Sequence, residues 1–172
     1  MRVVTKEVAL AALGEHRKAL LGGELRCVMC ALATREQARE RVAESAHAVV
    51  LLDRFACRYG HLMVIAKSHV ERASELSWPV YSDIQRLAFD AIRAVEQCFA
   101  PARVFTATLG AAVELPMTYS HYHVHVIPVA ETDERARPAR VLSWSEGVLV
   151  YEDAEVEPIC QKLRLAFSHT SG

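Results

Sequence analysis

Apolar residues recur every three or four positions between residues 84 and 99, in the run IQRLAFDAIRAVEQCF. This spacing places them on one face of an amphipathic helix, which Pro101 is predicted to end. Residues 5–21 follow a looser helical pattern closed by a pair of glycines, and residues 156–167 outline a last helix. The pattern therefore predicts one long central helix and a helix towards each end of the chain.

Shorter apolar runs bounded by turn residues predict β-strands. These runs begin near Val42 and then cover residues 47–53, 62–66, 104–109 and 119–129. Residues 141–144 and 148–151 are predicted as additional edge strands, and a loop is expected around Pro79. Neighbouring strands with short connections pair antiparallel, so we predict an α+β fold with an antiparallel sheet of about five strands.

The length and composition of the chain suit one domain. Its 172 residues are 52% hydrophobic, which is enough to bury a sizeable core. We expect residues 1–23 to form an N-terminal helical extension and residues 24–172 a single domain that ends in a strand and a helix. The charged stretch 131–140 is predicted to be an exposed loop whose charges only solvate it.

The charge balance excludes several classes of partner. A net charge of -1 gives no overall field that would attract nucleic acid or an anionic membrane, so neither is expected as a partner. The apolar runs are far shorter than the roughly 20 residues that span a bilayer, and the first residues lack the apolar core of a signal peptide. A cytoplasmic protein is therefore expected.

Two of the five cysteines form a C-x-x-C pair, Cys27 and Cys30. This spacing suits half of a four-ligand zinc site, a redox dithiol or two simply buried thiols. A second C-x-x-C is missing from the sequence, so the other ligands of a zinc site must be histidines. The candidates are His47, His61, His69 and the three histidines described next. Cys57, Cys98 and Cys160 lie in apolar contexts and are interpreted as core residues.

Three histidines alternate with bulky residues in the run SHYHVHVIPV: His121, His123 and His125. In a β-strand such residues share one face, so three imidazoles would form a row. The outer two would lie roughly 13 Å apart, whereas zinc binds nitrogen at about 2.0–2.1 Å, so one ion cannot bind all three. Different members of the row must therefore do different jobs.

The run from residue 121 to 127 resembles the signature of the histidine triad family, in which three histidines alternate with apolar residues. A second block, residues 51–53 followed by 60–65 and 67–70, is similar to the strand, loop and strand of that family. The resemblance covers roughly residues 27–129. It implies a histidine triad fold, a homodimer and a nucleotide substrate.

The resemblance also implies roles for individual residues. His123 would attack the α-phosphorus of a nucleotide and form a covalent nucleotidyl-histidine, which water or another acceptor then resolves. His125 would donate a hydrogen bond to the charge that develops on the phosphoryl oxygens, with the Thr118 hydroxyl and the Gly110 backbone as further donors. Asp53 matches the acceptor for the ribose hydroxyls in this family.

The zinc-bearing bacterial branch of the family implies a structural metal site. Its ligands in this chain would be Cys27, Cys30, His69 and His121. Such a closed sphere leaves no position for water, so the zinc would hold the strand rather than act on substrate. No organic cofactor is implied. His47 and His61 receive no role and are interpreted as structural or surface histidines.

One segment departs from the family pattern. Nucleotide-hydrolysing members usually carry Asn-Gly and Gly-Gln where residues 110–117 read GAAVELPM, and Arg54 and Val129 also depart from the usual residue types. The leading expectation is hydrolysis of a nucleoside phosphoramidate or a nucleotidyl phosphoester or anhydride. The alternatives are a nucleotidyltransferase or phosphorylase, and a nucleotide-binding module with little turnover.

Overall fold

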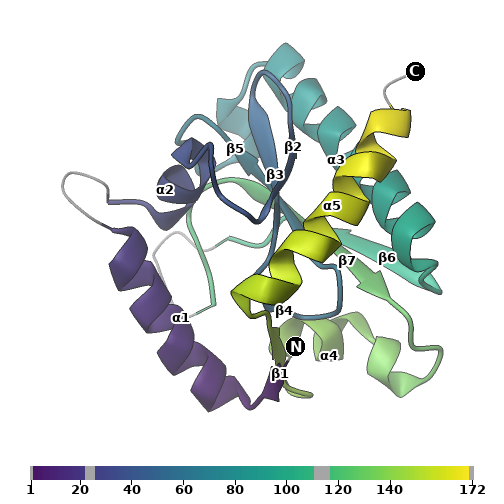
Figure 1. The fold of residues 1–172 in the computed structure, drawn as a ribbon. Coiled ribbons are helices and arrows are strands. Elements are labelled where there is room, and N and C mark those ends of the chain that lie inside the picture. Colours follow the sequence, from purple (N-terminus) through teal and green to yellow (C-terminus); the bar gives the residue numbers. More distant parts are fainter. Residues whose placement is uncertain (1, 22–25, 111–116, 171–172) are drawn as a thin grey trace.

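The computed structural model describes residues 2–21, 26–110 and 117–170, and it has the predicted α+β architecture (Figure 1). Its main sheet is antiparallel and contains five strands in the order β2-β3-β5-β7-β6. The strands are β2 (Arg41–Glu44), β3 (Ala48–Leu52), β5 (Leu62–Ala66), β6 (Arg103–Ala107) and β7 (His123–Val129). The predicted strand count and pairing are thus confirmed.

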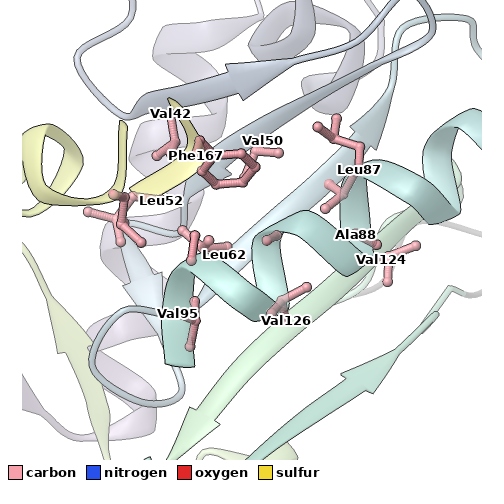
Figure 2. Close-up of a cluster of buried hydrophobic side chains, with 14 of the residues drawn as sticks. Val42, Val50, Leu52, Leu62, Leu87, Ala88, Val95, Val124, Val126 and Phe167 are labelled. Carbon is pink, nitrogen blue, oxygen red and sulfur yellow. The ribbon is translucent and has the colours of Figure 1, made fainter. Parts of the chain in front are cut away.

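One face of this sheet carries the largest hydrophobic core. Alternate residues of β7, Val124 and Val126, point to this face and pack with β3, β5 and the helices α3 (Trp78–Phe99) and α5 (Asp153–Thr170). Figure 2 shows these side chains in the same buried cluster as those of Leu62 and Phe167. Because side chains alternate along a strand, His123 and His125 must point to the opposite face.

That opposite face is covered by shorter helices from the N-terminal part of the chain. α2 (Val28–Thr34), which the sequence did not predict, packs on Leu51, Met63 and Ile65. α1 (Lys6–Leu20) matches its predicted range, and the hydroxyl of Thr5 accepts a hydrogen bond from Val8 N at its start. The predicted glycine stop after α1 falls outside the described residues.

A second, three-stranded sheet was not predicted. It contains β1 (Arg2–Val4), β8 (Val148–Val150) and β4 (Phe55–Ala56) in the order β1-β8-β4. β8 was correctly located, but it is the central strand of this small sheet and not an edge strand. Each of its partners is only two or three residues long, which is too short for a sequence pattern to show.

Three predicted boundaries are wrong. Residues 141–144 are not a strand but lie in and directly after the helix α4 (Pro138–Ser143). Trp144, with a positive φ of 60°, caps its C-terminus. This helix begins with a proline, which suits a first helical turn. Pro79 lies not in a loop but in the first turn of α3 for the same reason. The histidine strand begins at His123, because Tyr122 N donates instead to Val70 O in the segment that follows β5.

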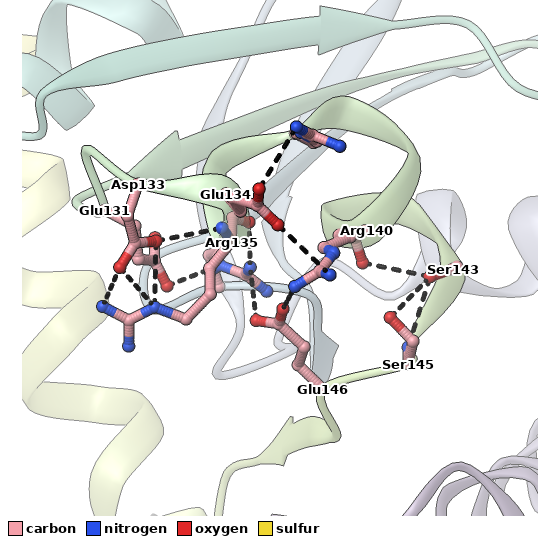
Figure 3. A network of polar contacts seen from close by, with 10 residues as sticks. Glu131, Asp133, Glu134, Arg135, Arg140, Ser143, Ser145 and Glu146 are labelled. Carbon is pink, nitrogen blue, oxygen red and sulfur yellow. Dashed lines mark hydrogen bonds and ion pairs between the residues drawn. The ribbon is translucent and has the colours of Figure 1, made fainter.

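The charged stretch 131–140 is more structured than predicted. It contains the short helix η2 (Glu134–Ala136) and the start of α4, and a further short helix, η1 (Ala73–Glu75), precedes α3. Figure 3 shows the charged side chains of residues 131–140 linked to one another and to Glu146. Arg140 lies 3.5 Å from the carboxylate of Glu146. Arg58 also reaches Glu131 at 3.0 Å. These charges therefore order the segment as well as solvate it.

Among the described residues, no helix is both long and apolar enough to cross a membrane.

Candidate active site and metal centre

The site is built on the face of the main sheet that α1 and α2 cover. β7 pairs with β5 so that His123 lies opposite Ile65 and His125 lies opposite Met63. His61 precedes β5 by one residue, and with Met63 and Ile65 it occupies alternate positions of the same segment. The register therefore places three histidines of two neighbouring strands close together.

Five backbone and side-chain groups are joined by a continuous chain of four hydrogen bonds. His123 Nδ1 lies 2.7 Å from the carbonyl oxygen of His121, and His123 Nε2 lies 3.1 Å from His125 Nε2. His125 Nδ1 in turn lies 2.9 Å from His61 Nε2. At the far end, Cys57 N donates to His61 Nδ1 at 3.3 Å.

The backbone carbonyl at one end sets the proton positions along this chain when the rings are neutral. A carbonyl oxygen only accepts, so His123 Nδ1 must carry a proton and the neutral ring keeps its lone pair on Nε2. His125 must then donate from Nε2 and accept at Nδ1, which makes His61 Nε2 the donor. The arrangement leaves His123 with an unprotonated nitrogen and sets an N–H of His125 beside it.

Asp53 joins this group at the end of β3. Its backbone N donates to His61 O at 2.9 Å, and its Oδ1 accepts from Phe55 N at 2.9 Å. Its Oδ2 lies 3.2 Å from His61 Nδ1, a contact that stabilises the protonated form of that ring. The side chain of Asp53 retains 14% exposure and borders the cavities described below.

Burial keeps the site histidines neutral. It lowers the pKa of His125 well below the usual histidine value, and the charges that His61 and His123 would carry lower it further. Burial also lowers the pKa of His123, although its hydrogen bond to His121 O and the charge of Asp53 act in the opposite direction. Burial likewise lowers the pKa of His61 against the effect of Asp53.

The four predicted metal ligands meet in one cluster. His69 Nδ1 lies 3.2 Å from His121 Nδ1 and 3.4 Å from Cys30 Sγ. Both Cys27 Sγ and Cys30 Sγ lie 3.5 Å from His121 Nδ1. A tetrahedral zinc ion with ordinary bond lengths separates two nitrogens by roughly 3.3 Å and sulfur from nitrogen by roughly 3.5 Å. The donor set therefore has the spacing that a zinc ion needs.

A second contact supports this cluster. His121 Nε2 lies 2.8 Å from the carbonyl oxygen of Ala66, so Nε2 carries the proton and Nδ1 is free to bind a metal. The redox alternative has less support, because burial and the neighbouring thiol raise the pKa of Cys30, whereas a reactive dithiol needs a lowered one. Of the other cysteines, Cys57 and Cys160 are buried, while Cys98 is half-buried.

Two hollows border the histidines. The larger, of about 370 Å³, is lined by Gly110, His121 and His123 together with exposed residues near η1. The smaller, of about 70 Å³, is lined by Asp53, His61 and His125 and is walled by apolar side chains that include Leu13 of α1. His123 thus borders the larger hollow together with Gly110, and His125 borders the smaller one together with Asp53.

For two predicted site residues, Thr118 and Gly110, the structure shows contacts that involve the backbone. Thr118 is half-buried, and its carbonyl oxygen accepts a hydrogen bond of 2.8 Å from Arg17 of α1. A Cβ on Gly110 would approach Tyr119 O to 3.1 Å, which explains a glycine at this position. The altered phosphate segment, residues 111–116, lies outside the described residues.

His61 received no role from the sequence, but the structure places it in the chain of hydrogen bonds with His125. His47 is exposed, in agreement with its interpretation as a surface histidine. The alternation of His61 with Met63 and Ile65 was a usable signal, because it placed this histidine on the sheet face of its neighbours. The reasoning also missed Arg17, whose guanidinium lies 4.3 Å from the ring centre of Tyr119. No pattern in α1 indicates that contact.

Comparisons with known proteins identify the family of the chain. The family model of the HIT domain matches residues 34–132. An uncharacterized 16.1 kDa HIT-like protein of Mycoplasma pneumoniae is 27% identical over 106 residues, which are 62% of this chain and 73% of that protein.

Two solved structures share the fold. A zinc-bound histidine triad family protein from Mycobacterium smegmatis superposes with a TM-score of 0.63 at 20% identity, covering 86% of this chain and 97% of that one. A uridylyltransferase structure superposes with a TM-score of 0.64 at 16% identity and covers 98% of this chain and 53% of its own.

Proposed function

Because the chain belongs to the HIT domain family, we propose that it hydrolyses a nucleoside phosphoramidate or a nucleotidyl phosphoester or anhydride through a nucleotidyl-His123 intermediate. One observation carries this proposal: the hydrogen bond from His123 Nδ1 to His121 O leaves the lone pair of His123 on Nε2. Family membership supplies the substrate class, a nucleotide.

The first step is a displacement at phosphorus. His123 Nε2 forms a bond to the α-phosphorus of the nucleotide, while the bond from phosphorus to the leaving amine, alcohol or phosphate breaks, and a leaving amine or alcohol takes up a proton from solvent. The His125 N–H, which lies 3.1 Å from that nitrogen, turns to a non-bridging oxygen as negative charge grows there. In the second step water attacks the same phosphorus, the P–N bond breaks, and the nucleoside monophosphate leaves.

The remaining site residues hold the substrate. Asp53 accepts from the ribose hydroxyls with the lone pairs that Phe55 N leaves unused, and Gly110 and Thr118 provide donors on the phosphate side. The larger hollow beside Gly110 and His123 accommodates the leaving group.

Product analysis with labelled inorganic phosphate tests the reaction type. Hydrolysis predicts an unlabelled nucleoside monophosphate, with the oxygen of solvent water as the new atom. A nucleotidyltransferase or phosphorylase, the second candidate, would instead place the label in a nucleoside diphosphate. The support for this alternative is that a uridylyltransferase structure shares the fold of this chain. Binding of nucleotide without turnover of any such substrate would identify a binding module.

We also propose that Cys27, Cys30, His69 and His121 hold a structural zinc ion. The ion would tie the helix α2 to the start of the strand that carries His123. Metal analysis should find about one zinc ion per chain, in keeping with four-ligand structural sites. Cys30→Ser should lose it, whereas the matched change Cys98→Ser should keep it. A metal-free protein with a reversible Cys27–Cys30 disulfide would instead identify the pair as a redox dithiol.

A further inference from the structure

Glu40 is a buried carboxylate that the proposed chemistry does not use. It directly precedes β2, and only 4% of it is exposed. Within the part of the chain that the structure describes, no donor forms a hydrogen bond or ion pair with its carboxylate. The accepting lone pairs of this carboxylate are therefore available to donors of a ligand that enters the neighbouring cavity.

The position of Glu40 continues the path of the active site. Its carbonyl oxygen accepts from Leu52 N at 2.9 Å, so it lies beside the residue that precedes Asp53. Glu40 and Asp53 both line a narrow cavity of about 30 Å³, whose walls include Leu51, Phe55 and Met63. Asp53, Phe55 and Met63 also line the cavity that contains His61 and His125.

The path therefore runs from His125 past Asp53 to Glu40. Under the proposed function, these residues contact the phosphate and the ribose in that order, so the next group of a nucleotide, its base, falls at Glu40. The apolar walls suit the faces of a base, and the carboxylate at the end can bind only a base edge that carries donors.

We propose that Glu40 recognises the base of the substrate and that this base is guanine. Guanine presents N1–H and the N2 amino group side by side, and a carboxylate can accept from both in a bidentate pair. Adenine and cytosine set a ring acceptor beside their single amino group, and uracil flanks its N–H with two carbonyl oxygens. Each of these would direct a lone pair at the carboxylate. The inference rests on the proposed function, because it extends the same pocket.

The N-terminal helix α1 takes part in this subsite. Leu13 borders both cavities, and His16 borders the one at Glu40, where its ring lies 5.8 Å from that of Phe55. Typical ligand pockets have about 300–1,000 Å³, so Leu13 and His16 must move outward when a base enters. α1 would thus have to shift for a base to enter the subsite.

Calorimetric titration of the full, zinc-loaded chain with GMP, IMP and AMP tests the assignment. We expect GMP to bind at least about tenfold more tightly than AMP, the size of effect that one bidentate base contact gives. IMP, which keeps N1–H and lacks the N2 amino group, should fall between them. Equal affinities for GMP and AMP would overturn the assignment, and this comparison uses only the natural protein.

A pair of variants locates the effect. Glu40→Gln should abolish the preference for GMP over AMP, because the carboxamide offers one donor and one acceptor in place of two acceptors. Glu36→Gln, an exposed change in the same connection, should keep the preference of the natural protein. Weakening of both nucleotides alike by Glu40→Gln would refute base recognition. If the His123 adduct forms without base preference, the guanine assignment fails and the proposed function stands. If no nucleotide binds and no adduct forms, both fail.

Discussion

At the scale of single residues, the chemistry depends on which nitrogen of each histidine carries the proton. The spacing of His121, His123 and His125 was enough to predict that they have different roles, and the structure shows how two are separated. His121 directs Nδ1 towards the sulfur atoms of Cys27 and Cys30, whereas His123 directs Nδ1 to a backbone carbonyl. The contact of His61 with His125 was not predictable from spacing alone, because it depends on the register between β5 and β7.

His61 is expected to position His125 rather than touch the substrate. His61→Ala should slow adduct formation by about 10- to 100-fold, as loss of supporting hydrogen bonds does at other sites. It should also move the acid limb of the pH–rate profile upward, because the charge of His61 helps to lower the pKa of His125. Stopped-flow mass analysis measures both effects. His47→Ala is the matched control, and a slower rate with an unmoved acid limb would indicate a merely structural role.

The pH profile of the natural protein follows from the same burial. Burial lowers the pKa values of His123 and His125, so their rings stay neutral as the pH falls through the usual histidine value of about 6.5. Activity is lost only when the pH falls through the lowered values, where His123 gains a proton on Nε2 and His125 gains one on Nδ1, which breaks its hydrogen bond with His61. The rate of adduct formation should therefore be flat from pH 8 to below pH 6.5. A midpoint at or above 6.5 would contradict this account.

At the scale of elements, periodicity predicted the long segments and missed the short ones. The apolar face of α3 and the runs of β3 and β5 repeat over enough residues to be recognised. β1 and β4 have only three and two residues, and they exist because β8 lies between them. Such elements are specified by tertiary contact, which a local pattern does not contain.

The C-terminal helix α5 is expected to be part of the core. Leu163 is fully buried between α5 and the main sheet, whereas Leu165 on the same helix is 65% exposed. Leu163→Ala should lower the free energy of unfolding by about 2–5 kcal/mol, because it leaves a cavity. Leu165→Ala should change it by less than about 0.5 kcal/mol. Urea denaturation of both variants measures the difference, and equal effects would show that α5 does not pack as described.

At the scale of the whole molecule, the outer edge of β6 pairs with no other strand among the described residues, and one face of α3 is exposed. β6 is the last strand of the main sheet, and α3 beside it carries the exposed apolar residues Trp78 and Phe89. An uncovered strand edge next to exposed aromatic residues is suited to pairing with another chain. The sequence predicted a homodimer by resemblance alone, and these features indicate which surface it would use.

We expect the protein to form a homodimer through β6 and α3. Phe89→Glu should produce monomers, because it places a charge in the apolar contact, whereas Leu165→Glu on α5 should leave the dimer intact. Sedimentation equilibrium reports the mass directly. A natural protein that remains monomeric, or a dimer that survives Phe89→Glu and dissociates with Leu165→Glu, would contradict this assignment.

The central claim is that His123 attacks phosphorus, and intact-mass spectrometry of acid-free, rapidly desalted protein tests it most directly. After mixing with a panel of nucleoside phosphoramidates and nucleotidyl anhydrides, the natural chain should gain the mass of one nucleotidyl group, and His123→Ala should gain none. Peptide mapping should place the adduct on His123. An adduct of equal yield in His123→Ala, or one on another residue, would contradict the account.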